Sequence, residues 1–309
     1  MKKLLTILPA VLIIVILTGE IKAQDDLSGY AAPFIRMELG ARGLALGGAL
    51  TASDPDGASF YYNPAALPFL EQKTLLFSYR QLSLDRFFRV ISISLPLKPT
   101  GGFSAAWISS GVDNIMGRDF TGNITESIDY SENAFYFSFG INPSEKVGIG
   151  ISGKILRSKI YTLTSNAFAI DLGILLKPVN DLIIGIQAKD LNGKYPWDSN
   201  SIYERGTKTY DKLPKILNIG VNYKYKYFKT DLYAGATFYS TTGKVLRIGI
   251  EKEVIENLTL RSGLFNKSFS GGIGIKFSML KKGGFIDYAY VSVKNDPSVN
   301  HVFSVRVSF

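Results

Sequence analysis

The side chains that could carry chemistry in this chain are few and of limited type. Its 309 residues include no Cys and a single His, His301. The absence of Cys excludes disulfide frameworks and thiolate chemistry, and a single His excludes most His-based metal sites and catalytic triads. We therefore expect no cofactor, no metal ion and no enzymatic activity.

One motif in the sequence resembles a nucleotide site. Gly148, Gly150 and Gly153 have the spacing of the dinucleotide-binding fingerprint. That fingerprint requires a strand before the glycines and a helix after them. Here residues 147–152 alternate between aliphatic side chains and Gly or Ser, which indicates that the glycines lie inside a strand. We expect them to make room for another part of the chain rather than to bind phosphate.

Charged residues of both signs form the third candidate group. Paired carboxylates for acid–base catalysis require a specific cavity, which a sequence alone does not define. Because these charges fall on one side of alternating segments, we expect them to form a salt-bridged lining facing an interior. The six lumen-facing charges in this prediction are Asp171, Arg247, Glu251, Arg261, Asp287 and Arg306.

The elements that would position these residues are short segments of period-2 alternation, separated by Gly, Pro, Asn, Asp and Ser. Each has about the ~9–11 residues that a tilted transmembrane strand needs. They predict an all-β fold, a transmembrane antiparallel β-barrel of about 14 strands over residues 73–309. The expected strands are 73–83, 86–97, 101–111, 131–142, 145–157, 167–178, 180–191, 213–225, 227–239, 243–253, 256–266, 269–279, 282–293 and 299–309.

A soluble β-sandwich would also alternate, but the placement of charge separates the two folds. Within the expected strands, the apolar faces carry only Arg89 and Lys252 as charged residues, both toward strand ends. A basic residue facing lipid at mid-membrane costs about 2–4 kcal/mol, whereas one facing a wet lumen costs little. The pattern therefore favours lipid outside and a polar interior. On this assignment His301 faces lipid near the outer rim, which argues against a Ser–His pair for lipid hydrolysis.

The links between the strands predict the orientation of the barrel. Short links alternate with the longer, polar links Val112–Tyr130, Ser158–Asn166 and Asn192–Lys212. Outer-membrane barrels have short periplasmic turns and longer extracellular loops. We therefore expect the short links to face the periplasm, together with both ends of the barrel. The short links include Pro96–Thr100, Asn142–Glu145, Lys177–Asn180, Val254–Ile255 and Leu280–Lys281.

The two ends of the chain carry expected export and assembly signals. Lys2 and Lys3 precede a short apolar run, which predicts a cleaved signal peptide over residues 1–23 and a mature chain from Gln24. The final alternating strand ends on Phe309, a terminal aromatic of the kind that the barrel-assembly machinery recognises. We therefore expect a protein of the bacterial outer membrane, with that machinery and outer-membrane lipid as partners.

The charge of the expected mature chain is mildly basic. Residues 24–309 contain 32 Lys and Arg against 25 Asp and Glu, a net charge of +7. The basic residues are scattered rather than clustered on one face, so nucleic acid is not an expected partner. Such a charge suits an anionic glycolipid surface or acidic cargo.

Residues 24–72 do not alternate and differ from the barrel. They are rich in Gly, and Asn63-Pro64 is suited to begin a short helix with Asn63 as N-cap. About fifty residues without disulfide or metal are too few for an independent core, so we expect this segment to fill the lumen as a plug. Arg36 and Arg42 are expected to pair with lumen carboxylates. The plug motif consists of Gly40, Arg42, Gly43, Gly47, Gly48, Asp54, Asp56, Asn63 and Pro64.

This motif resembles a signature of the PorV/PorQ outer-membrane proteins, which are related to the FadL long-chain fatty-acid channels. The similar parts are Gly40-Ala41-Arg42 with Gly47-Gly48-Ala49, and Asn63-Pro64-Ala65. Further similar motifs follow in the family's order, at 102–119, 213–225, 257–263, 287–291 and 301–305. The resemblance implies a 14-stranded barrel with its N-terminal segment in the lumen.

Three functions stay open from the sequence. The resemblance implies a role in protein secretion of the type IX kind, with secreted cargo proteins as partners. A FadL-like channel for hydrophobic ligands is the alternative, and a structural or surface-interaction barrel is the third. The modest extracellular links count against the secretion role, because secretion members of the family carry longer ones.

Overall fold

The structure is a computed structural model. It describes residues 30–200, 202, 204–240, 243–265, 268–279, 282–292 and 300–309. The expected signal peptide, its cleavage before Gln24 and the first residues of the N-terminal segment lie outside the described residues.

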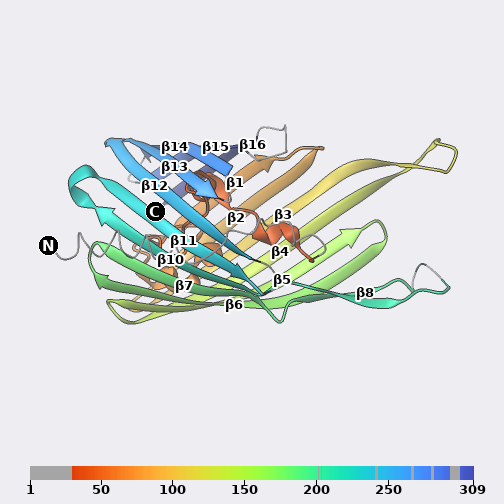
Figure 1. Ribbon diagram of the computed structural model, residues 1–309, viewed down its shortest axis with the longest axis horizontal. Coiled ribbons are helices and arrows are strands. Elements are labelled where there is room, and N and C mark those ends of the chain that lie inside the picture. The colour runs from red at the N-terminus through yellow and green to blue at the C-terminus, as the bar shows by residue number, and fades with distance from the viewer. Residues whose placement is uncertain are drawn as a thin grey trace.

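Within the described ranges, fourteen antiparallel strands close into a barrel in which β1 pairs with both β2 and β16 (Figure 1). The predicted all-β barrel of about 14 strands is confirmed. In the part of the chain that is described, no helix is both long and apolar enough to cross a membrane. The barrel strands are β1 (Thr74–Gln81), β2 (Arg86–Leu97), β3 (Gly101–Arg118), β4 (Ile124–Ser144), β5 (Val147–Ile160), β6 (Leu163–Val179), β7 (Leu182–Leu191), β10 (Ile216–Tyr225), β11 (Thr230–Tyr239), β12 (Lys244–Ile255), β13 (Leu258–Phe265), β14 (Ser268–Met279), β15 (Lys282–Val291) and β16 (Asn300–Ser308).

The two faces of the strands follow the predicted alternation. On β4, Phe137 is 53% exposed on the outside, whereas its neighbours Tyr136 and Ser138 are buried inside. A closed barrel with an apolar exterior leaves no unpaired strand edge in lipid, which is the condition for a sheet to span a membrane. His301 lies on the exposed face, and its Nδ1 lies 2.6 Å from the Tyr288 hydroxyl.

The prediction that three long loops connect the strands at the outer end was wrong, because most of these residues form strands. Val112–Tyr130 and Ser158–Asn166 are mostly strand, because β3 continues to Arg118 and β6 begins at Leu163. The link Asn192–Lys212 contains a separate hairpin, β8 (Lys194–Asp198) and β9 (Lys208–Lys212). Beyond the membrane both strand faces are wet, so apolar alternation stops while backbone pairing continues. Figure 1 shows β8 and the β3–β4 end projecting from the side opposite the C label.

The described part of the N-terminal segment, from residue 30 on, contains four short helices. They are η2 (Pro33–Arg36), α2 (Gly40–Ala45), α3 (Ser59–Tyr62) and η3 (Pro64–Phe69). Asn63 caps η3 as predicted, because its side-chain oxygen accepts a hydrogen bond from the N–H of Ala65 at 3.1 Å, and Pro64 occupies the first turn. The segment lies among the inward-facing side chains of the barrel. For example, the N–H of Ala41 donates to the Ser304 hydroxyl on β16.

Candidate functional site in the barrel lumen

The inner wall of β2–β6 is built from four successive rows of residues paired across the five strands. Going toward the periplasm, the rows change from apolar, through mixed and hydroxyl-bearing, to nearly all glycine. The rows are Val90, Ile108, Ala134, Leu156 and Ala167; Ser92, Ala106, Tyr136, Lys154 and Ala169; Ser94, Ser104, Ser138, Ser152 and Asp171; and Pro96, Gly102, Gly140, Gly150 and Gly173.

The apolar row faces the lumen, yet it is buried. Ile108, Ala134 and Leu156 each have no exposed surface, and they belong to one hydrophobic cluster with Phe34 and Ile35 of the N-terminal segment. An apolar inner surface is unusual in a barrel, because the lumen is commonly polar and wet. In this protein that surface is buried in a cluster with apolar side chains of the N-terminal segment and of the link between β7 and β10, such as Tyr195 and Leu213.

The glycine row forms the seat of η3. A Cβ added at Gly140 would lie 2.7 Å from the Pro64 carbonyl oxygen, and one added at Gly150 would overlap the Pro64 backbone. Only residues without a side chain permit this approach. Asn63 fixes the position, because its Nδ2 donates to the carbonyl oxygens of Thr51 and Ile174 at 2.9 and 3.1 Å. Gly148 and Gly150 thus lie within β5 and contact the segment, as the sequence predicted for these glycines.

On the opposite wall, alternating charges connect the segment to the barrel. Arg42 pairs with Asp56 within the segment and with Glu251 on β12, each at 2.9 Å. Arg261 on β13 bonds Glu251 at 2.9 Å and Asp287 on β15 at 2.7 Å. Burial opposes the charge of the Arg42 guanidinium, but the Glu251 and Asp56 carboxylates raise the pKa of Arg42 well above its usual value.

Three more ion pairs attach the segment to this wall. Asp56 pairs with Arg306 on β16 at 3.1 Å. Glu38 pairs with Arg247 on β12, and Asp54 pairs with Lys224 on β10. The segment therefore bridges the lumen. It packs closely on glycines of both walls, for example Gly150 on β5 and Gly263 on β13, and it adds ion pairs on the β10–β16 side.

The expected plug-motif residues have distinct places in this arrangement. Gly40, Gly47 and Gly48 adopt positive φ angles, a conformation that favours glycine. A Cβ at Gly43 would overlap the Tyr62 ring, so this glycine allows α2 to pack on α3. Arg36 does not pair with a lumen carboxylate as expected. Its guanidinium instead donates to the carbonyl oxygen of Ala31 at 2.7 Å.

Asp171 belongs to a separate buried cluster that the sequence did not predict as a unit. Lys154 on β5 bonds Asp171 on β6 at 2.6 Å and also bonds Asp190 on β7, and none of the three side chains is exposed. Asp190 has a φ of 60°, next to a register shift between β6 and β7. Simple alternation places Asp190 outside, so no periodic signal identified it.

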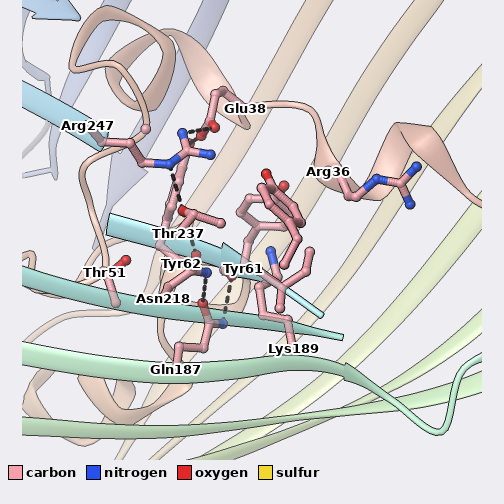
Figure 2. Close-up of a pocket in the computed structure, with 13 residues that line it drawn as sticks. Arg36, Glu38, Thr51, Tyr61, Tyr62, Gln187, Lys189, Asn218, Thr237 and Arg247 are labelled. Atoms are coloured by element: carbon pink, nitrogen blue, oxygen red, sulfur yellow. Dashed lines mark hydrogen bonds and ion pairs between the residues drawn. The ribbon is translucent and has the colours of Figure 1, made fainter. Parts of the chain in front are cut away.

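Several cavities border the segment. An outer one contains about 30 Å³, little more than one water needs, and lies between the segment and β7, β10, β11 and β12. Figure 2 shows the Lys189 side chain of β7 beside Tyr61, over whose ring its Nζ lies at 3.6 Å from the centroid. A second cavity, of about 520 Å³, lies at the periplasmic end among charged residues that include Arg42, Asp56 and Lys229.

Solved structures share this fold at low sequence identity. The Pseudomonas putida toluene transporter TodX superposes with a TM-score of 0.61 at 13% identity, covering 88% of this chain and 97% of that one. A Pseudomonas aeruginosa FadL homologue gives 0.65 at 11% identity, covering 91% and 99%. The CymD monoaromatic hydrocarbon channel gives 0.62 at 12% identity, covering 87% and 96%. The chain shares the fold of these three proteins.

The comparisons of sequence found no match. No family model matches the chain, and no curated protein matches it. Its fold and its apolar outer face place the chain in the bacterial outer membrane. Two of the structures similar to it are a toluene transporter and a monoaromatic hydrocarbon channel. The PorV/PorQ resemblance stays a prediction from motifs.

Proposed function

We propose that this barrel is a channel for hydrophobic small molecules, and that residues 30–72 act as its plug. The observation that supports it best is the buried apolar row on β2–β6, which the lumen would not need if it conducted only polar solutes. Phe34 and Ile35 of the plug belong to the same buried hydrophobic cluster as that row. Displacing them would expose an apolar surface inside the barrel. A hydrophobic solute that covers this surface gains about 25 cal/mol of favourable free energy for each Å² of apolar area buried.

The attachments of the plug to β10–β16 differ in burial. The Arg42–Glu251 pair is mostly buried, and the end of α2 packs closely on glycines of β12 and β13. The Asp54–Lys224 pair is partly exposed, with 39% of the Asp54 side chain accessible, and an ion pair in contact with water contributes little net stability. We propose that the segment begins to open at the Asp54–Lys224 contact and keeps its seat on the glycine row.

The direct test is uptake of a labelled aromatic hydrocarbon by cells with this protein in their outer membrane, compared with vector-only cells. We expect uptake above the vector level. Ile108→Asn and Leu156→Asn should each reduce that uptake by about tenfold or more, because burying an apolar side chain against a solute contributes roughly 1.5–3 kcal/mol. Ile155→Thr, on the lipid-facing side of β5, is the matched control and should leave uptake unchanged.

Uptake of the hydrocarbon at the vector level by the folded wild-type protein would refute the channel proposal. The alternative is the secretion role that the PorV/PorQ resemblance implies. The β3–β4 and β8–β9 hairpins, which project from the barrel, are the feature that favours it. Co-purification of secreted proteins with the tagged barrel, together with absent uptake, would support that alternative.

A further inference from the structure

A sharp boundary crosses the outward face of β2–β6 near the extracellular end. The last apolar row consists of Ile91, Trp107, Phe135, Ile155 and Phe168, and the next row outward consists of Arg89, Ser109, Asn133, Arg157 and Asn166. The Trp107 indole N–H donates to the Asn133 side chain across this boundary, at 3.0 Å. Indole rings favour the level where acyl chains meet headgroups. The polar row therefore lies at the headgroups of the outer leaflet.

Basic side chains gather at this level. Arg89 and Arg157 belong to the first polar row, and Lys159 to the row beyond it, and all three are exposed on the outward face. Among the residues that the structure describes, none of the three forms an ion pair. The Arg and Lys side chains that contact the N-terminal segment in the lumen, in contrast, are paired with carboxylates. The outward carboxylate of Asp129, farther from the membrane, accepts the N–H of Asn114.

The Arg89 side chain is held in place by its neighbours. Its guanidinium carbon lies 4.1 Å from the Phe87 ring centroid and 6.0 Å from that of Tyr79. A guanidinium stacked on aromatic rings keeps its N–H groups at the edge free to donate to an anion. Arg89 and Arg157 lie three strand spacings apart, about 14 Å at roughly 4.8 Å a strand.

From this arrangement we propose that the outward face of β2–β5 binds the phosphorylated glycolipid of the outer leaflet. Its acyl chains lie along the apolar rows below the boundary. Its phosphate groups are bound by Arg89, Arg157 and Lys159, and its sugar hydroxyls lie near Asn133. This site is on the outside of the wall, so it does not depend on the channel proposed for the lumen.

The test measures binding of purified phosphorylated glycolipid, and of its dephosphorylated form, to the delipidated full-length protein in neutral detergent micelles. The variant is Arg89→Gln/Arg157→Gln/Lys159→Gln. We expect the wild type to prefer the phosphorylated form and the variant to bind it about a hundredfold more weakly, since each basic residue near an anionic lipid surface contributes on the order of fivefold. Binding of the dephosphorylated form should be equal for the two proteins.

The matched control removes three exposed cations elsewhere on the barrel, as Lys98→Gln/Lys146→Gln/Lys252→Gln. It loses the same total charge and should bind like the wild type. Heat-modifiable gel migration checks that each protein is folded. The proposal is overturned if the triple variant on β2–β5 binds as tightly as the wild type, if the control weakens equally, or if the wild type does not distinguish the two glycolipids.

Discussion

Lys154→Met is expected to be among the most damaging single substitutions in the barrel. The change leaves Asp171 and Asp190 without the cation between them, at a position where none of the three side chains is exposed. Removing one partner of a buried ion pair typically costs about 3–5 kcal/mol, a large part of the roughly 5–15 kcal/mol that stabilises a folded protein. The measurement is the free energy of unfolding in denaturant. Unfolding is monitored on gels by the loss of heat-modifiable migration.

Two companion variants separate charge from packing in that experiment. Lys189→Met removes a neighbouring cation that contacts the Tyr61 ring, and it should cost clearly less. Lys154→Met/Asp171→Asn/Asp190→Asn should recover most of the lost stability, because neutral amides replace the unpaired carboxylates. A Lys154→Met protein as stable as the wild type would contradict the assigned cluster.

Deleting residues 30–68 is expected to turn a closed or flickering barrel into an open pore. The segment bridges the lumen from the glycine row to the ion pairs on β10–β16, so its removal opens the space between the two walls. In planar bilayers the deleted protein should show steady conductance, whereas the full chain should conduct little. Equal conductance of the two folded proteins would contradict the plug assignment.

The predictions of strands and of their faces from the sequence succeeded where the side chains alternate every two residues between apolar and polar. In the membrane one strand face meets lipid and the other the lumen, so alternation identifies both strand and face, as for Phe137 and Tyr136. At Ile115–Ser127, outside the membrane, both strand faces meet water, so the apolar–polar alternation stops although the strands remain paired. The hairpin was therefore mistaken for a loop.

Contacts between the segment and the wall were only partly predictable. The expectation that Arg42 would meet a lumen carboxylate agrees with its bond to Glu251, because a buried guanidinium requires an acceptor. Arg36 satisfies the same requirement with backbone carbonyls, which no pattern of side chains reveals. Asp190 faces inward only through a local register shift, and such shifts leave little trace in a single sequence.

The most direct test of a plug-controlled channel is to tether the segment to the wall. The chain has no Cys, so a Thr51→Cys/Gly220→Cys protein contains one pair. A Cβ at Gly220 would lie 3.0 Å from the Thr51 Cβ, which a small shift converts to the roughly 3.5–4.5 Å of a disulfide. Hydrocarbon uptake should fall to the vector level when the pair is oxidised, and a reductant should restore it to the level of either single variant. Uptake by the oxidised protein at the rate of the single variants would contradict the account.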